Sequence, residues 1–84
     1  MHRVLLERMA ERGLRQLPAA EFSRVIEKIK ALADDARPPG CRKLTGSKTG
    51  WRIRVGAYRV LYEVDDAEQT VIVMRVRHRR RAYR

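Results

Sequence analysis

Apolar residues recur every three or four positions through the first half of the chain, which is the spacing of one face of an amphipathic helix. A first stripe runs from Met9 to Leu17. A second, longer stripe consists of Phe22, Val25, Ile26, Ile29, Leu32 and Ala33. Pro18 separates the two at a position suited to the first turn of a helix, and the pair Pro38-Pro39 ends the second because proline cannot continue a helix. The pattern predicts a hairpin of two helices.

The second half of the chain changes to a period of two, which is typical of half-buried strands. The run WRIRV (51–55) alternates strictly between apolar and basic residues. YRVLYEV (58–64) and TVIVMRV (70–76) are also rich in strand-forming residue types. RVLL (3–6) is compatible with a further short strand before the helices. We therefore expect three strands in this half, with a possible fourth at the start of the chain.

Gly56-Ala57 fits a two-residue hairpin loop with glycine at its first central position. Such a loop pairs Arg54 with Arg59 and Ile53 with Val60. The apolar face of the hairpin, which the two helices can cover, then comprises Trp51, Ile53, Val55, Tyr58, Val60, Tyr62 and Val64. The outer face comprises Arg52, Arg54, Arg59, Leu61 and Glu63.

The third strand can join this sheet in two registers, which depend on the length of the preceding loop. A five-residue loop, Asp65 to Gln69, places Ile72, Met74 and Val76 in the core and leaves Arg75 and Arg77 on the outer face. A loop one residue shorter exchanges these sets and buries Arg75, because a shift of one residue turns every side chain to the other face. We therefore favour the longer loop.

The charge of the chain is its main anomaly. Its 84 residues allow one domain with one modest core, and they include 20 Lys and Arg against 10 Asp and Glu, a net charge of +10. Sixteen of the basic residues are arginine, and the segment 40–84 carries a net charge of +8. Arginine forks onto phosphate and stacks on bases, so this balance points to RNA, DNA or an acidic protein partner.

The predicted register sets Arg54 directly across from Arg59, with Arg52 and Arg75 nearby. Like charges opposite each other destabilise a sheet, and an anion bound between them is one physical reason to keep them. A solvated outer face, on which arginine stems cover apolar surface, is the simpler alternative. We favour anion binding, because four arginines converge where alternation would accept any polar residue.

The C-terminal run VRHRRRAYR (76–84) adds two groups that could move protons, His78 and Tyr83. A third strand that ends at Arg77 would bring both of them beside the outer face. Cleavage of RNA without a metal needs little more: the 2′-hydroxyl is the nucleophile, and the protein orients it, takes its proton, stabilises the phosphorane and protonates the leaving oxygen.

Other chemistries find little support in the sequence. There is no phosphate loop, no catalytic triad order and no Cys/His cluster with metal-site spacing, so we expect no metal and no cofactor. Cys41 is the sole cysteine and is interpreted as an inert thiol. No apolar run reaches the length of a membrane span or a signal peptide, so we expect a soluble cytoplasmic protein.

The segment RPPGCRKLTGSKTGWRIRVGAYRVLYEVDD (37–66) and the ending MRVRHRRRAYR (74–84) resemble the RelE side of the RelE/ParE toxin superfamily. The preceding helix, LPAAEFSRVIEKIKALADD (17–35), also matches, so the resemblance covers nearly the whole chain. It implies a single α+β domain over residues 1–84 with the order β-α-α-β-β-β, whose helical hairpin packs on one face of a mostly antiparallel twisted sheet. It also implies a toxin that enters the A site of the 30S ribosomal subunit and cuts messenger RNA, and a cognate antitoxin with an acidic toxin-binding segment.

The resemblance implies separate roles for individual residues. Arg59 is similar to an arginine that binds the scissile phosphate. Arg79 is similar to one that stabilises the transition state or protonates the leaving group. Tyr83 is similar to a terminal tyrosine that stacks on the substrate base and helps to deprotonate the 2′-hydroxyl. With His78, these form the expected catalytic set. The expected RNA-binding set is Arg52, Arg54, Lys43, Arg75, Arg77 and Arg81.

Two departures from the family pattern leave alternatives open. Many relatives carry an acid at the positions of Ala57 and Arg81, and the loss of the second could slow proton transfer or add a backbone contact. A ParE-like inhibitor of DNA gyrase keeps the fold and changes the target. A non-catalytic basic module would bind RNA or DNA with a steep salt dependence and no cleavage.

Overall fold

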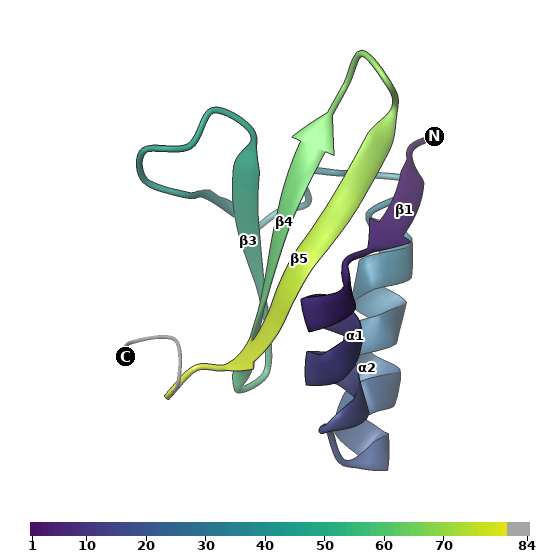
Figure 1. The fold of residues 1–84 in the computed structure, drawn as a ribbon, viewed down its shortest axis with the longest axis vertical. Coiled ribbons are helices and arrows are strands. Elements are labelled where there is room, and N and C mark those ends of the chain that lie inside the picture. The colour runs from purple at the N-terminus through teal and green to yellow at the C-terminus, as the bar shows by residue number, and fades with distance from the viewer. Residues whose placement is uncertain (81–84) are drawn as a thin grey trace.

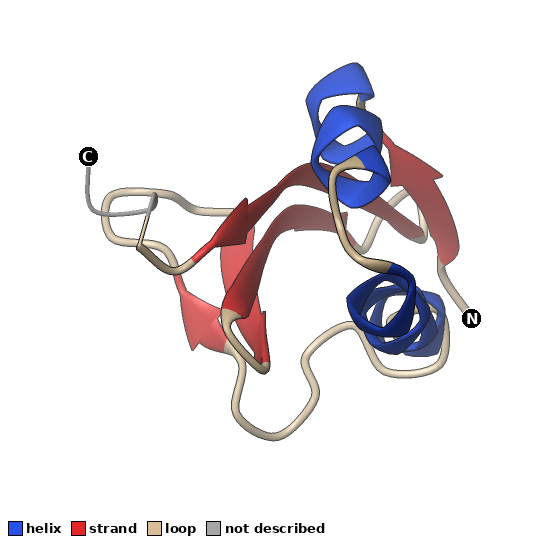
Figure 2. Ribbon diagram, turned by 90° about the horizontal axis from the view of Figure 1, so that it is seen from below, coloured by secondary structure: helices blue, strands red, loops and turns tan. Residues whose placement is uncertain are grey.

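Two helices pack on one face of a curved five-stranded sheet (Figure 1, Figure 2). The structure, a computed structural model, describes residues 1–80 of the chain. Its elements are β1 (Arg3–Leu6), α1 (Arg8–Arg15), α2 (Ala19–Ala31), β2 (Arg42–Lys43), β3 (Gly50–Val55), β4 (Tyr58–Asp65) and β5 (Thr70–His78). The strand order is β1-β5-β4-β3-β2, with β1 parallel to β5 and every other pair antiparallel. The predicted α+β class is confirmed, and the structure adds the short strand β2.

The helical hairpin contributes its predicted stripes to the core. Ala10 and Leu14 of α1 are buried, as are Val25 and Ile29 of α2. Phe22, which the periodicity places in the core, is instead 39% exposed. The reason is its position in the first turn of α2, which extends past the end of the sheet (Figure 1). Within residues 1–80, no helix is both long and apolar enough to cross a membrane.

The β3–β4 hairpin has the predicted register. Val55 pairs with Tyr58, and Arg54 pairs with Arg59. Gly56 has a φ of 60°, a backbone conformation that glycine adopts without steric cost. The buried apolar side chains of the hairpin are Ile53, Val55, Val60, Tyr62 and Val64, all from the face that was predicted to meet the helices. Arg59, on the outer face, is buried as well.

The β4–β5 pairing corrects the predicted loop and two of the three core residues predicted for β5. Asp65 pairs with Thr70, so the loop is one residue shorter than expected. Val71, Val73 and Val76 are therefore the buried residues of β5, whereas Ile72 and Met74 are only partly buried.

A β-bulge then restores the predicted orientation of the arginines. Tyr62 pairs with Val73 but Leu61 pairs with Arg75, so Met74 is an extra residue in β5. The extra residue reverses the alternation a second time. As a result Arg75 shares the outer face with Leu61, as expected, although the loop is the shorter one.

Candidate nucleic-acid interface

Two rows of arginines cross the sheet on the face that the helices leave open. In the first row Arg59 pairs with Arg54 on one side and Arg77 on the other. In the second row Leu61 pairs with Arg52 and Arg75, and Arg42 of β2 pairs with Arg52. We call this set the arginine face: Arg42, Arg52, Arg54, Arg59, Arg75 and Arg77.

The arginine face concentrates positive charge on a rigid support. Neighbouring strands lie about 4.8 Å apart, so side chains in one row are close neighbours. Arg59, at the centre of the first row, is only 8% exposed, and burial strengthens electrostatic interactions by excluding water. Glu63 and Asp65 are the acidic residues that alternation places on this face of β4, and Glu63 accepts a hydrogen bond from Thr49 Oγ1 at 2.9 Å. The arrangement suits an anion that spans several strands.

A small cavity joins the arginine face to the segment after β5. It has a volume of about 300 Å³ and is lined by Arg54, Gly56, Tyr58, Arg59, Arg79 and Arg80. The backbone N–H of Arg79 donates a hydrogen bond to the carbonyl of Ala57 at 2.7 Å, which holds this segment against the β3–β4 turn. Arg59 and Arg79, both predicted to act in catalysis, therefore line one cavity. Tyr83 and Arg81 lie outside the described residues.

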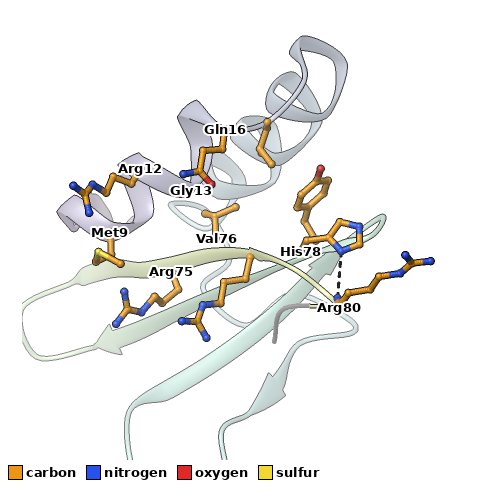
Figure 3. Close-up of a pocket in the computed structure, with 11 residues that line it drawn as sticks. Met9, Arg12, Gly13, Gln16, Arg75, Val76, His78 and Arg80 are labelled. Carbon is orange, nitrogen blue, oxygen red and sulfur yellow. Dashed lines mark hydrogen bonds between the residues drawn. The ribbon is translucent and has the colours of Figure 1, made fainter. Parts of the chain in front are cut away.

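His78 lies on the other side of the sheet from the arginine face. It pairs with Tyr58, and the two rings meet edge to face with their centroids 5.3 Å apart. Its Nδ1 accepts a hydrogen bond from the backbone N–H of Arg80 at 3.2 Å (Figure 3). In the figure the imidazole lies on the same side of β5 as Val76, facing the helices. The structure thus does not bring His78 together with Arg59.

Strand β2 brings a residue to this face that the sequence interpretation missed. Lys43 pairs with Trp51, whose ring belongs to the helix-covered face, whereas Arg42 pairs with Arg52. Arg42 therefore lies on the arginine face and Lys43 does not. The sequence could not reveal this difference, because a strand of two residues is too short to show an alternating pattern.

The resolved pKa shifts lie outside the arginine face, at Tyr62 in the core and at Arg37 and Asp66 near the β4–β5 turn. Burial raises the pKa of the Tyr62 hydroxyl, which donates a hydrogen bond to the carbonyl of Ala36 at 2.8 Å. Asp66, in the β4–β5 turn, accepts a hydrogen bond from Arg37 Nη2 at 2.8 Å and lies 3.1 Å from His2 Nε2. The Arg37 guanidinium lowers the pKa of Asp66, and the hydrogen bond to Asp66 raises that of Arg37. These groups tie three segments of the fold together.

Comparisons with known proteins agree on the family. The model described as "ParE toxin of type II toxin-antitoxin system, parDE" matches residues 4–83. A protein named Toxin RelG from Mycobacterium tuberculosis is 37% identical over 81 residues, which cover 89% of this chain and 87% of that protein.

Solved structures show the same fold. The archaeal RelE–RelB complex from Pyrococcus horikoshii OT3 matches with a TM-score of 0.83 and 26% identity, over 93% of this chain and 94% of that one. The RelBE2 toxin–antitoxin complex from Mycobacterium tuberculosis matches with a TM-score of 0.79 and 29% identity, over 93% and 98% of the two chains. The isolated RelE toxin of E. coli, at 21% identity, matches in fold with a TM-score of 0.81 over 93% and 84%. The chain belongs to the RelE/ParE superfamily and is a RelE-like toxin of a type II toxin–antitoxin system.

Proposed function

We propose that this toxin is a ribosome-dependent endoribonuclease that cuts messenger RNA in the ribosomal A site and so inhibits translation. The observation that carries the proposal is the cavity that Arg59 of the first arginine row shares with Arg79. During cleavage of a phosphodiester, negative charge develops on the equatorial oxygens and on the leaving oxygen. Cationic groups on both sides of the phosphorus stabilise this charge.

In the proposed reaction the 2′-oxygen of the substrate attacks the adjacent phosphorus and loses its proton. The bond from phosphorus to the 5′-oxygen breaks, and that oxygen leaves after it is protonated. Arg59 binds the scissile phosphate, and Arg79 stabilises the transition state or supplies the proton. Tyr83 stacks on the base and helps to remove the 2′ proton. His78 lies on the other side of the sheet and has no role in these steps. The protein needs no cofactor for these steps.

The remaining outer-face arginines hold the RNA backbone in this proposal. Arg52, Arg54, Arg75 and Arg77 continue the rows beyond Arg59, and Arg42 extends the second row to the edge of the sheet. Arg81 was also expected to bind RNA from the sequence. Lys43 was expected as well, but its place opposite Trp51 removes it from this face, and Arg42 takes its role here. Side chains that contact successive phosphates fix the position of the strand without reading its bases.

The proposed protein partner is a cognate antitoxin that covers the arginine face with an acidic segment. Two similar toxins were solved as RelE–RelB and RelBE2 complexes, which supports a partner of this kind. Such a complex would form in the cytoplasm, where the messenger RNA and the ribosome are found.

The test is cleavage of a defined messenger RNA on purified ribosomes, followed by primer extension. Wild type is expected to cut within the A-site codon only when ribosomes are present, and Arg59→Gln, Arg79→Gln and Tyr83→Phe are each expected to cut more slowly. Arg8→Gln, on the exposed side of α1, is the matched control for loss of charge. No cutting by wild type would refute the enzyme assignment, and full activity of Arg59→Gln and Tyr83→Phe would refute the site.

A second function is favoured by one observation, the match to the ParE family model. A ParE-like toxin would inhibit DNA gyrase instead of cutting RNA. Incubation with gyrase and supercoiled DNA separates the two functions: gyrase-dependent DNA breaks with intact messenger RNA would establish this alternative.

A further inference from the structure

A second, larger cavity lies between α1 and one edge of β5 (Figure 3). Strand β1 pairs only with the segment Thr70–Val73, so the rest of β5 has α1 rather than a strand along this edge. The cavity has a volume of about 840 Å³. We call it the α1–β5 groove; its polar lining residues include Arg12, Gln16, Arg75, Arg77, His78 and Arg80.

The α1–β5 groove is cationic on both sides. Figure 3 shows Arg12 and Gln16 on the helix above the strand, and Arg75 on the opposite side of the strand. None of the residues that line it carries a carboxylate. Nη1 of Arg75 is buried and has no hydrogen-bond partner within residues 1–80. A buried donor without an acceptor is costly, and an oxygen-rich anion in the groove would supply acceptors.

The nearest charged neighbour of Arg12 one turn earlier on α1 is another arginine, which destabilises the helix. Arg8 lies four residues earlier on α1, and like charges at this spacing repel each other. Glu11, in the same helix, pairs instead with Arg15 at 3.4 Å. In the part of the chain that the structure describes, Arg12 has no ion pair. A ligand anion would offset this repulsion.

The α1–β5 groove continues into the arginine face. Arg75 and Arg77 belong to both, and Tyr58 and Arg80 line both the groove and the smaller cavity of Arg59 and Arg79. The edge-to-face pair of Tyr58 and His78 lies where the two cavities meet. Aromatic rings beside arginines form the usual surface for an unpaired base next to its phosphate.

We propose that the α1–β5 groove binds a segment of RNA backbone adjacent to the segment that lies on the arginine face, with Arg12 as a binding residue on α1. The inference rests on the proposed function and extends its binding site to a residue outside the recognised motifs. An RNA strand fits better than an acidic peptide, because guanidinium groups on both sides match phosphates and the ring pair matches a base. Messenger RNA next to the cut codon and ribosomal RNA share this chemistry.

The test compares wild type, Arg12→Gln and the control Arg8→Gln, which removes the same charge from α1 outside the groove. Binding is measured by fluorescence anisotropy with two uncleavable 2′-O-methyl RNAs, a trinucleotide and a nonanucleotide, over a range of salt concentrations. We expect Arg12→Gln to weaken binding of the longer RNA about three- to tenfold and to reduce its salt slope by about 0.7, the loss of one phosphate contact. Binding of the trinucleotide and the behaviour of Arg8→Gln should stay close to wild type.

A second arm measures binding of the same variants to vacant ribosomes by sedimentation. If Arg12→Gln binds the longer RNA more weakly, messenger RNA is the occupant of the groove. If it binds only the ribosomes more weakly and the longer RNA normally, ribosomal RNA is the occupant. Unchanged binding in both arms overturns the proposal. If Arg12→Gln then binds only the antitoxin more weakly, the groove takes an acidic peptide and not RNA. These outcomes are separate from the enzyme assignment. If wild type does not cut RNA but Arg12→Gln weakens RNA binding, only the enzyme assignment fails. If wild type cuts RNA but Arg12→Gln binds RNA and ribosomes normally, only the groove proposal fails.

Discussion

The carbonyl group of Val76 on β5 fills the space that the Cβ atom of any other residue would occupy at Gly13 on α1. This contact brings the backbone of α1 close to the strand that carries Arg75 and Arg77. It positions α1 along the edge of β5, and it therefore determines the width of the α1–β5 groove.

Gly13→Ala is expected to destabilise the protein even though Gly13 lies in a helix. In an unobstructed helix the change would stabilise by roughly 0.5–1 kcal/mol. Here the new methyl group meets a backbone carbonyl that cannot rotate away, and such overpacking costs about 1–3 kcal/mol. Urea denaturation followed by circular dichroism measures the difference. The control is Ser23→Ala on the exposed side of α2, which should not lower stability; a Gly13→Ala protein as stable as wild type would contradict the contact.

Arg54→Gln should make the protein more stable and a weaker RNA binder. Arg54 lies opposite Arg59, and removing one of two like charges across a sheet relieves repulsion of about 0.2–1 kcal/mol. Thermal unfolding and anisotropy with single-stranded RNA measure the two effects on one protein. With Lys48→Gln, at an exposed loop residue outside the rows, neither quantity should change by a comparable amount. Lower stability of Arg54→Gln would show that its charge has a favourable partner in the free toxin.

Tyr62→Phe should cost about 1–3 kcal/mol, because it leaves the buried carbonyl of Ala36 without its hydroxyl donor. Tyr58→Phe is the matched control, since the Tyr58 hydroxyl has no hydrogen bond within residues 1–80. Equal stability of the two variants in urea would show that the Tyr62 hydroxyl contributes little.

The same tyrosine should affect stability at alkaline pH. The folded protein holds the pKa of Tyr62 above its ordinary value, so its contribution is complete below the unfolded pKa of about 10 and is lost as the pH rises beyond it. Tyr62→Phe should therefore lose stability less steeply than wild type above about pH 10. If the stability of the two proteins falls with equal steepness above this pH, the pKa of Tyr62 is not raised in the folded protein.

Asp66→Asn should lower stability at neutral pH and flatten its loss in acid. Arg37 and His2 face Asp66, and the lowered pKa of this carboxyl means that its contribution is present above the unfolded pKa and is lost as the pH falls through the folded one. Urea midpoints measured from neutral pH into acid should therefore converge for wild type and Asp66→Asn below about pH 4. Asp34→Asn, at an exposed residue, should follow wild type throughout.

Local pattern was enough to predict the helical hairpin, the β3–β4 register and the placement of Arg54 opposite Arg59. A two-residue hairpin loop allows only one register between the two strands that it joins. Strict alternation along the strands then assigns each side chain to one face of the sheet. The family resemblance added the order of the elements, and the fold confirms it.

The β4–β5 pairing shows where pattern is insufficient. Ile72 and Val73 are both strongly apolar, so alternation alone does not decide which of them is buried. The longer loop was predicted because, in an unbroken strand, only that loop keeps Arg75 out of the core. The structure buries Val73 and still keeps Arg75 on the outer face, because the extra residue Met74 forms a bulge. A bulge reverses which face each following side chain points to.

The sequence by itself determined the charge, the two helices, the first hairpin and the family of this protein, since each depends on residues close together in the chain or on motifs. Only the tertiary structure decided that Arg42 rather than Lys43 joins the arginine face, that His78 lies on the opposite side, and that Arg12 shares a groove with Arg75. Those placements depend on strands and helices that meet across long separations in sequence, where packing and pairing, and not local periodicity, set which side chains are neighbours.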